Sequence, residues 1–265
     1  LLEAEGVEVK KGKAFFQSSN TVRIEMEHNA ETVNFENAII ATGSQPTELP
    51  GFEFEKNKVI SSKELLDLKE VPDEIVVIGG GYIGMEAVTK FCKFGSTVKV
   101  VEFQDRVLSN FDEELVNEIQ EVSGCYNDEI YTSTEAKELN YRDDKAVVVA
   151  DQEDGEIEVE GDYVLVAVGR TVSPNIEGLN IENTDIELDE NGFVKTDQQM
   201  KTTDDSIYAI GDIAGQPMLA HKAYREGKVA AEAVAGEPAV FDNQYIAKVT
   251  YTDPEVAVVG LDPEE

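Results

Sequence analysis

The feature that most constrains the fold is the segment at residues 75–103, which reads IVVIGGGYIGMEAVTKFCKFGSTVKVVEF. An apolar run leads into a glycine-rich turn, the turn opens an amphipathic helix, and a second apolar run ends in the acidic residue Glu102. The glycines follow the pattern G-x-G-x-x-G and stand at Gly79, Gly81 and Gly84. Strand, turn, helix, strand and acid in this order predict a dinucleotide-binding unit. The alternative is a glycine-rich turn in an ordinary α/β protein.

Each glycine of the turn has a separate expected role. Gly79 permits the tight turn out of the strand, Gly81 lets the backbone approach a pyrophosphate, and Gly84 lets the helix pack closely on the strand. The amides at the start of the helix then face the anion. Helical spacing predicts a buried face that consists of Ile83, Ala87, Phe91 and Phe94, and it places the end of the helix at Gly95.

Glu102 indicates which dinucleotide the unit prefers. A carboxylate at the end of the second strand can accept hydrogen bonds from both ribose hydroxyls of an adenosine. The same negative charge repels a 2′-phosphate. We therefore expect NAD to be favoured over NADP.

The chain is strongly acidic, with 55 Asp and Glu residues against 22 Lys and Arg residues and a net charge of -33. Nucleic-acid binding is not expected, because phosphate affinity depends on Lys and Arg, and association with anionic membranes is disfavoured for the same reason. The carboxylates are scattered, which is typical of solvated faces rather than of one acidic tail. We interpret the excess as an adaptation to high salt, where counterions screen the self-repulsion of the chain.

Cellular location and cysteine chemistry follow from what the sequence contains. Cys92 and Cys125 form no close C-x-x-C or C-x-x-x-x-C pair, so we expect reduced structural thiols. No apolar run is long enough to span a bilayer and no signal-peptide pattern is present, which predicts a soluble, cytoplasmic protein. No metal site is predicted. The first residue is Leu1 rather than Met, which suggests an internal fragment.

The rest of the chain predicts an α/β fold with two doubly wound sheets. Strand-like segments at residues 7–40 indicate a small meander, and Ser61 and Glu64 have capping-box spacing. Asp112 is expected to cap a helix that follows it. Four apolar strands run into glycine, with the sequences VVIGGG, AIIATGS, LVAVGR and IYAIGD. Such junctions suit ligands bound beyond the carboxyl ends of parallel strands, although any single glycine can simply end a strand.

The motifs ATGS, GGGYIGME, VGR and AIGD, in this order and spacing, resemble the pyridine nucleotide-disulfide oxidoreductases nearly end to end. Within that family, MLAHKA at residues 218–223 is most similar to the dihydrolipoamide dehydrogenase group. The resemblance implies two Rossmann-like domains, with an NAD domain inserted in a split FAD domain. It implies four segments: the later part of the FAD domain with its meander and linker (1–72), the NAD domain (73–170), the return of the FAD domain (171–240), and the start of a dimerisation domain (241–265).

The resemblance also implies which residues hold the two cofactors. The expected NAD residues are Gly79, Gly80, Gly81, Tyr82, Ile83, Gly84, Glu86, Glu102, Ala136, Gly169 and Arg170. The expected FAD residues are Thr42, Gly43, Ser44, Asp212, Met218, Leu219, Ala220 and His221. Glu86 would position the nicotinamide, or is simply an exposed helix carboxylate. Asp212 would accept a hydrogen bond from a ribityl hydroxyl, or is a cap. Arg170 would face phosphates or pair with a carboxylate, and His221 is open to a capping or packing role.

The implied reaction takes electrons from a dithiol, through a disulfide and FAD, to NAD in a homodimeric enzyme of cell redox homeostasis. The dithiol would be one such as dihydrolipoamide carried on an acyltransferase. Three family features are missing from this sequence: the amino-terminal glycine motif for FAD, the redox C-x-x-x-x-C, and the carboxyl-terminal His-Glu pair. The chain alone is therefore expected to be inactive. Alternatives are a mercuric or glutathione-type reductase, a soluble transhydrogenase, and a nucleotide-binding module without chemistry of its own.

Overall fold

The computed structural model describes residues 2–122, 124–125, 129–243 and 245–260. The chain divides into two units, of which unit 1 comprises Leu1–Gln45 and Thr171–Ile246, and unit 2 comprises Pro46–Arg170 and Ala247–Glu265. Residues 46–72, which sequence analysis grouped with the FAD domain, thus lie in unit 2, because their strand joins the parallel sheet of that unit. Residues 244 and 261–265 of the expected dimerisation segment lie outside the described residues.

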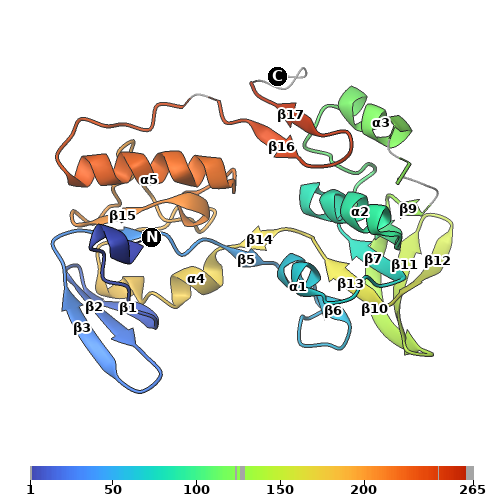
Figure 1. The fold of residues 1–265 in the computed structure, drawn as a ribbon, viewed down its shortest axis with the longest axis horizontal. Coiled ribbons are helices and arrows are strands. Elements are labelled where there is room, and N and C mark those ends of the chain that lie inside the picture. The colour runs from blue at the N-terminus through green and yellow to red at the C-terminus, as the bar shows by residue number, and fades with distance from the viewer. Residues whose placement is uncertain (1, 123, 126–128, 244, 261–265) are drawn as a thin grey trace. The chain divides into compact units, whose positions relative to one another are not determined.

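Unit 1 combines an antiparallel meander with a short parallel strand pair (Figure 1). The meander runs in the order β1-β2-β3, as predicted, and β4 pairs in parallel with β15. The strands are β1 (Lys13–Ser18), β2 (Thr21–Glu25), β3 (Ala30–Asn34), β4 (Ala38–Ile40) and β15 (Ile207–Ala209). The helices are η1 (Leu2–Glu5), α4 (Ser173–Glu177), η2 (Ile181–Asn183), η3 (Gly211–Ala214) and α5 (Ala220–Val234). One buried cluster, including Phe16, Ile40 and Ile207, joins the meander to the strand pair.

Unit 2 is built on a five-stranded parallel sheet in the order β6-β13-β7-β8-β9. Its strands are β6 (Val59–Ile60), β7 (Glu74–Ile78), β8 (Thr97–Val101), β9 (Ile130–Tyr131) and β13 (Tyr163–Val166). The helices are α1 (Ser62–Asp67), α2 (Tyr82–Phe94) and α3 (Glu113–Val122). A three-stranded antiparallel sheet and a hairpin complete it: β10 (Glu135–Arg142), β11 (Lys145–Gln152), β12 (Gly155–Gly161), β16 (Lys248–Thr250) and β17 (Val256–Val258). The short strands β5 (Gln45–Pro46) and β14 (Arg170–Thr171) lie where the chain passes between units.

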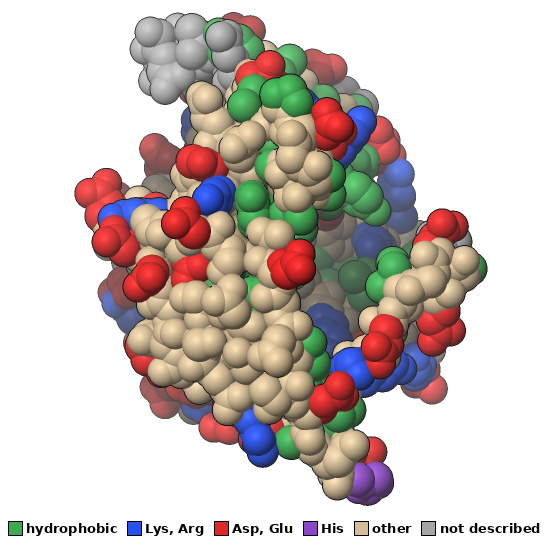
Figure 2. Space-filling view, turned by 90° about the vertical axis from the view of Figure 1, so that its left-hand side faces the viewer, with side chains coloured by type: hydrophobic (Ala, Val, Ile, Leu, Met, Phe, Trp, Pro, Cys, Tyr) green, Lys and Arg blue, Asp and Glu red, His purple; other side chains and the backbone are tan. Residues whose placement is uncertain are grey.

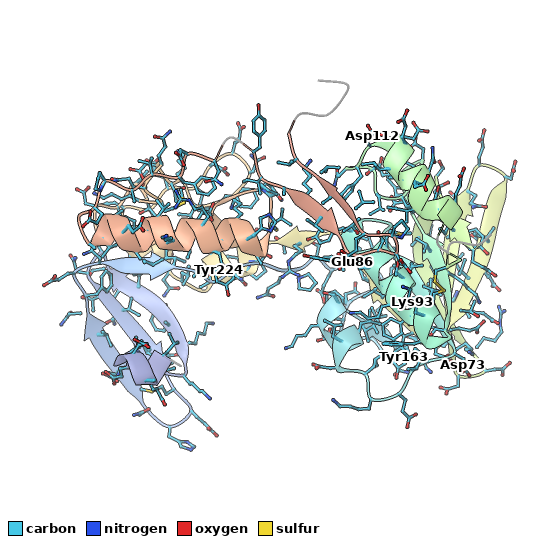
Figure 3. All side chains as sticks on the ribbon, turned by 45° about the horizontal axis from the view of Figure 1, so that its top comes forward. Asp73, Glu86, Lys93, Asp112, Tyr163 and Tyr224 are labelled. Carbon is cyan, nitrogen blue, oxygen red and sulfur yellow. A yellow bond between two sulfur atoms is a disulfide. The ribbon has the colours of Figure 1, made fainter. Side chains whose placement is uncertain are left out.

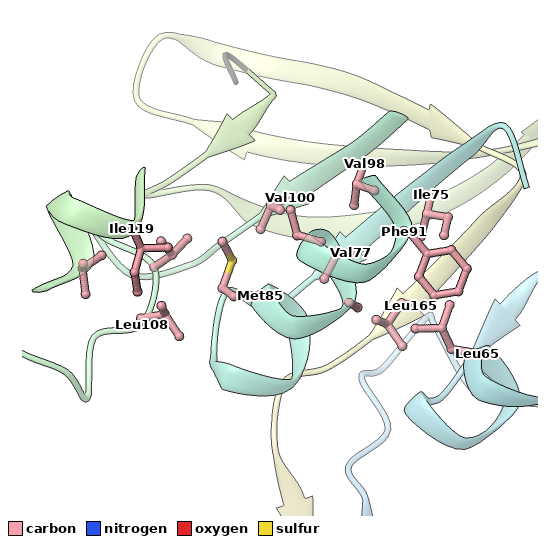
Figure 4. Packing of buried hydrophobic residues seen from close by; sticks show 14 of the residues in the cluster. Leu65, Ile75, Val77, Met85, Phe91, Val98, Val100, Leu108, Ile119 and Leu165 are labelled. Atoms are coloured by element: carbon pink, nitrogen blue, oxygen red, sulfur yellow. The ribbon is translucent and has the colours of Figure 1, made fainter. Parts of the chain in front are cut away.

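The parallel sheet of unit 2 is buried on both faces, so its strands are continuously apolar. Along β7, Ile75 and Val77 face α2, whereas Val76 and Ile78 face the sheet formed by β10, β11 and β12. This alternation follows from the two-residue period of a strand. Figure 4 shows the packing on the α2 side.

Helix ends agree with their sequence signals. Ser61 and Glu64 form the predicted capping box at α1, and the Asp112 carboxylate accepts a hydrogen bond from the Glu114 amide at 2.9 Å, in the first turn of α3. Gly95 ends α2 in the left-handed conformation. Its positive φ of 99° is the geometry for which glycine is preferred at this position.

The predicted buried face of α2 is wrong in part. Ala87 and Phe91 are buried, but Phe94 is 61% exposed, and Met85 and Val88 take the central positions of the face. The helix is therefore turned so that Phe94 lies beside the face, where its ring meets Phe91 edge to face at 5.9 Å. Both settings fit a 3.6-residue period, and the close approach of the glycine turn to the sheet selects the observed one.

The prediction of two reduced thiols is also wrong, because Cys92 and Cys125 form a disulfide with a Cα–Cα distance of 5.7 Å. The bond joins the last turn of α2 to the segment after α3. The two cysteines are 33 residues apart in sequence, and only the packing of α3 onto the sheet brings them together. No local cysteine spacing signals such a bond.

Candidate nucleotide-binding sites

The glycine turn of unit 2 is shaped by close backbone contacts. Gly79 has a φ of +106°, and its amide donates to the carbonyl oxygen of Val101 at 2.9 Å. A Cβ on Gly84 would collide with the carbonyl oxygen of Gly79, so any larger residue would push α2 away from the strand. The geometry of the turn therefore requires glycine at positions 79 and 84, the first and third glycines of the motif.

The start of α2 presents an open backbone. Gly81 is the N-cap, makes no side-chain cap, and is exposed, and a Cβ placed on it would meet no atom within 4 Å. The first-turn amides of a helix lack partners within the helix and carry the positive end of its dipole. The turn thus offers an anion both space and hydrogen-bond donors.

The Glu102 carboxylate is built into this turn. It is buried, and one of its oxygens accepts a hydrogen bond from the Gly80 amide, while the other accepts from the Gln104 amide at 2.6 Å. In the part of the chain that the structure describes, it forms no ion pair. A carboxylate has about four acceptor positions, so two remain for hydroxyl groups of a ligand. The two amides hold its orientation fixed.

The other residues expected at the NAD site are more widely spread within unit 2. Ala136 lies on β10 and packs against the buried cluster that includes Ile78 and Val101. Gly169 lies between β13 and β14 with a φ of +134°, and its carbonyl oxygen accepts from the Thr47 amide at 3.0 Å. Arg170 begins β14 and is partly buried.

Glu86 has a contact that the sequence did not indicate. Its Oε1 accepts a hydrogen bond from the Tyr251 amide at 3.0 Å, and two turns further along α2 Lys93 forms an ion pair with Asp253. Figure 3 shows Glu86 and Lys93 along this helix. The β16–β17 hairpin is thus bound to α2 beside Glu86. The sequence separation of 165 residues between Glu86 and Tyr251 explains why sequence patterns missed the contact.

In unit 1, the parallel pairing of β4 with β15 brings two predicted segments together. The Ile210 amide donates to the carbonyl oxygen of Ile40 at 2.9 Å, which places the two strand ends side by side. Beyond them, the Ser44 hydroxyl donates to Oδ2 of Asp212. The Asn175 side chain donates to the carbonyl oxygen of Thr42 at 2.6 Å and so fixes the same loop. Thr42, Ser44 and Asp212 therefore form one strand-end site.

The start of α5 contributes the remaining predicted residues of unit 1. Leu219 is the N-cap and makes no side-chain cap, so the first amides of the helix resemble those of α2. His221 is exposed in the first turn, and Met218 packs against the buried cluster of this unit.

Sequence analysis assigned no site role to two buried charged residues of α5, Lys222, which lies in the MLAHKA motif, and Glu226. The Lys222 ammonium lies 2.9 Å from Oε1 of Glu226, and Oε2 of Glu226 accepts from the Gly211 amide at 2.7 Å. The available signal was a Lys and a Glu four residues apart, which ordinarily indicates a solvated helix pair. Only the position of α5 against the strand-end turn reveals that both are buried.

The described residues contain neither a metal-binding cluster nor a membrane-spanning helix. No group of three or more His, Cys, Asp or Glu side chains is placed to hold a metal ion. Among the same residues, no helix has the length and apolar character needed to cross a bilayer.

Comparisons with known proteins agree with this geometry. The family model described as pyridine nucleotide-disulphide oxidoreductase matches residues 1–227. A dihydrolipoyl dehydrogenase of Bacillus subtilis is 45% identical over 261 residues, covering 98% of this chain and 55% of that protein. Dihydrolipoyl dehydrogenase 3 of Haloarcula marismortui is 41% identical over 273 residues, covering 100% of this chain and 57% of that protein.

Solved structures also match the chain over almost its whole length. The chain matches a Cu(II) complex of the HOCl-induced flavoprotein disulfide reductase RclA from Escherichia coli with a TM-score of 0.89 and 25% identity, over 100% of this chain and 59% of that one. It matches LpdA from Mycobacterium tuberculosis with a TM-score of 0.88 and 26% identity, over 99% of this chain and 58% of that one. The chain spans little more than half the length of the curated relatives that it matches.

Proposed function

The chain belongs to the pyridine nucleotide-disulphide oxidoreductase family, and on that premise we propose that it is part of a dihydrolipoamide dehydrogenase that passes electrons from a dithiol, through a disulfide and FAD, to NAD. Members of this family use FAD and NAD. The observation that carries the proposal is the presence of two strand-end glycine turns in one chain, one beside the buried Glu102 and one bearing Asp212.

In unit 2, the chain's own residues would bind and orient the nicotinamide cofactor. The amides at the start of α2 hold the pyrophosphate, and Glu102 accepts hydrogen bonds from the adenosine ribose. Glu86, about half a turn beyond Gly84, orients the nicotinamide carboxamide. Tyr82, Ile83, Ala136, Gly169 and Arg170 complete the proposed site. The fit rests on the open face at Gly81 and on the fixed orientation of the Glu102 carboxylate.

In unit 1, the strand-end site would hold part of the flavin. Asp212 accepts a hydrogen bond from a ribityl hydroxyl, and the Ser44 hydroxyl fixes the orientation of its carboxylate. The amides at the start of α5 and the positive end of its dipole stabilise negative charge on the reduced ring. FAD and NAD, when bound, supply the electron and hydride chemistry, and the chain supplies position and electrostatics.

The dithiol chemistry is assigned to the rest of the protein. The chain's two cysteines are bonded to each other and do not form the family's C-x-x-x-x-C pair. We propose dihydrolipoamide carried on an acyltransferase as the physiological dithiol, and a cytoplasmic homodimer as the assembly. The names of the curated relatives support the dithiol assignment.

The test uses the full-length protein. We expect it to purify with bound flavin and to reduce NAD with dihydrolipoamide, and we expect NADP to be a poor acceptor. A preference for NADP with glutathione or Hg(II) as substrate would favour another reductase of the family, and hydride exchange between NADH and NADP analogues alone would favour a transhydrogenase. Nucleotide binding without any turnover would favour a binding module. Any of these results contradicts the proposal.

We further propose that the acidic surface is an adaptation to high salt. In Figure 2, red carboxylate side chains lie around much of the visible face, and blue cations are fewer. A relative from Haloarcula marismortui supports this interpretation. Because counterions screen repulsion among carboxylates, the unfolding midpoint should rise between dilute and molar KCl. An unfolding midpoint that does not respond to KCl would contradict the proposal.

A further inference from the structure

We propose that the buried ion pair Lys222–Glu226 is a positioning device that holds the η3 turn in the conformation that presents Asp212 to the flavin. The inference rests on the flavin-binding function proposed for unit 1. Lys222 and Glu226 touch no cofactor in this scheme and act through the backbone of the turn. Neither residue belongs to the strand-end motif itself.

The pair is bonded to both ends of η3. At the first residue, Glu226 accepts from the Gly211 amide at 2.7 Å, and Lys222 donates to the Gly211 carbonyl oxygen at 3.3 Å. Just beyond the last residue, Lys222 donates to the Gly215 carbonyl oxygen at 3.0 Å. With Glu226 at 2.9 Å as its third partner, the Lys222 ammonium uses all three of its donors. Asp212 is the second residue of the segment bounded by these contacts.

The burial of the pair indicates a requirement beyond packing. Lys222 is 5% exposed and Glu226 is 3% exposed. Lys and Glu are almost never buried to this extent unless they are paired, and an apolar pair of similar volume usually packs at least as well. What an apolar pair cannot supply is an acceptor for the Gly211 amide and donors for two carbonyl groups. Buried backbone groups without partners are costly, so the turn would shift.

The turn also fits α5 too closely to be adjusted easily. Gly211 has a φ of +76°, and a Cβ on it would lie 3.3 Å from the Cβ of Ala223. On the same side of the helix, a Cβ on Gly227 would lie 3.2 Å from Cδ1 of Ile210. This spacing leaves little room for water between helix and turn. The side chains of α5 must therefore satisfy the turn directly, and Asp212 receives its position from them.

A second ion pair of the same helix provides a matched control. Lys228 and Glu232 have the same four-residue spacing, but their side chains are 67% and 40% exposed and their charged atoms are 3.9 Å apart. Substituting this pair removes the same charges and the same side-chain types from α5. It leaves the η3 turn untouched.

The experiment compares K222M/E226L with K228M/E232L in the full-length protein. Three quantities are measured: the Kd for FAD from flavin fluorescence quenching, the visible circular dichroism of the bound flavin, and the melting temperature of the apoprotein. We expect K222M/E226L to bind FAD at least tenfold more weakly, with altered flavin dichroism and an apoprotein that still melts in a single cooperative transition. K228M/E232L should stay within twofold of wild type. Wild-type FAD affinity and dichroism in K222M/E226L would overturn the proposal.

A second variant covers the case in which K222M/E226L does not fold. E226D keeps the charge pair with Lys222 but withdraws the carboxylate from the Gly211 amide by one methylene. We expect FAD affinity to fall severalfold with the flavin dichroism changed, and unchanged values would overturn the inference. If wild type binds no FAD at all, the function proposed for unit 1 is wrong. If wild type and K222M/E226L bind FAD equally strongly, the positioning role is wrong and the function proposed for unit 1 stands.

Discussion

Both units hold a strand-end glycine turn with a buried carboxylate, but the two carboxylates come from different elements and differ in their ion pairing. Each has parallel strands that run into a glycine turn, and in each turn one amide is bound by a buried carboxylate, Gly80 by Glu102 and Gly211 by Glu226. In unit 2 the carboxylate comes from the end of the neighbouring strand and has no cationic partner among the described residues. In unit 1 it comes from the following helix and is neutralised by Lys222.

Under the proposed function, the difference separates a carboxylate that binds a ligand, Glu102, from one that supports a turn, Glu226. In the proposed function, the negative charge of Glu102 remains available to ribose hydroxyls, so one residue would both shape the turn and select the cofactor. The charge of Glu226 is cancelled, which keeps a second negative charge away from the start of α5, where the reduced flavin is proposed to lie. In the proposed function, unit 1 therefore relies on a separate carboxylate, that of Asp212, to contact the flavin.

The first prediction has the largest expected effect and concerns the stability of unit 2, where the chain's two cysteines form a disulfide. Closing a loop of 33 residues stabilises the native state by about 4 kcal/mol in the chain-entropy description. Reduction should therefore speed hydrogen exchange in α2 and β8, and leave β4 and β15 nearly unchanged. Exchange measured by mass spectrometry with and without a reductant checks this.

The control for this prediction is the C92S/C125S variant. It should show the fast exchange of unit 2 under both conditions, because it has no disulfide to reduce. Equal exchange in oxidised and reduced wild type would contradict a stabilising role for the bond. A uniform change in both units would mean that they do not unfold independently.

The second prediction tests Glu102 as the ligand-binding carboxylate. Glu102→Ala should weaken NADH binding to the full-length protein by roughly 1 to 3 kcal/mol, since a two-pronged ribose contact is lost. Discrimination against NADPH should fall as well, and flavin content should not change. Titration calorimetry with both cofactors measures the effect, and Glu114→Ala, an exposed carboxylate on α3, is the control. Unchanged NADH affinity would refute the assignment.

The third prediction concerns the separate ligand of unit 1. Asp212→Ala should lower FAD affinity by roughly 1.5 kcal/mol, the scale of one hydrogen bond to a charged group. NADH affinity should stay the same, which is the reverse of the Glu102 pattern. Flavin absorbance per protein after purification measures the effect, with the fully exposed Asp205→Ala as the control. A full yellow complement in the variant would count against the role of Asp212.

Sequence patterns predicted the features of both units that depend on residues close together in the sequence. The strand before Gly79, the capping box at Ser61 and the parallel strands that end in glycine follow from short-range periodicity and turn chemistry. The FAD and NAD contacts of individual residues remain predictions. Patterns failed where distant segments meet: the disulfide at Cys92, and the α5 ion pair at Glu226. An i,i+4 charge pair has the same sequence signature whether it lies in water or under a turn.

The last prediction has the smallest expected effect. It concerns a paired carboxylate that lies at the opposite end of the sheet from Glu102. Glu74, at the start of β7, lies 3.0 Å from both Lys145 and Lys99. Hydrogen bonds from Lys145 and then Lys99 lower the pKa of Glu74 below its ordinary value of 4.5. A carboxyl with a lowered folded-state pKa contributes stability above its unfolded-state pKa, and that contribution is lost as the pH falls through the folded-state value.

Lys145→Met should therefore destabilise the protein by about 1 kcal/mol at pH 7, a value at the top of the range for partly exposed pairs. Lys145 also lies 2.7 Å from Asp162. The difference from wild type should shrink as the pH falls below about 4.5, because Glu74 and Asp162 become protonated in both proteins. Urea unfolding at a series of pH values measures it. Lys137→Met, which removes the cation of an exposed pair with Glu135, should cost almost nothing. A deficit in Lys145→Met that does not change with pH would show that packing of its side chain, and not its charge, supports this end of the sheet.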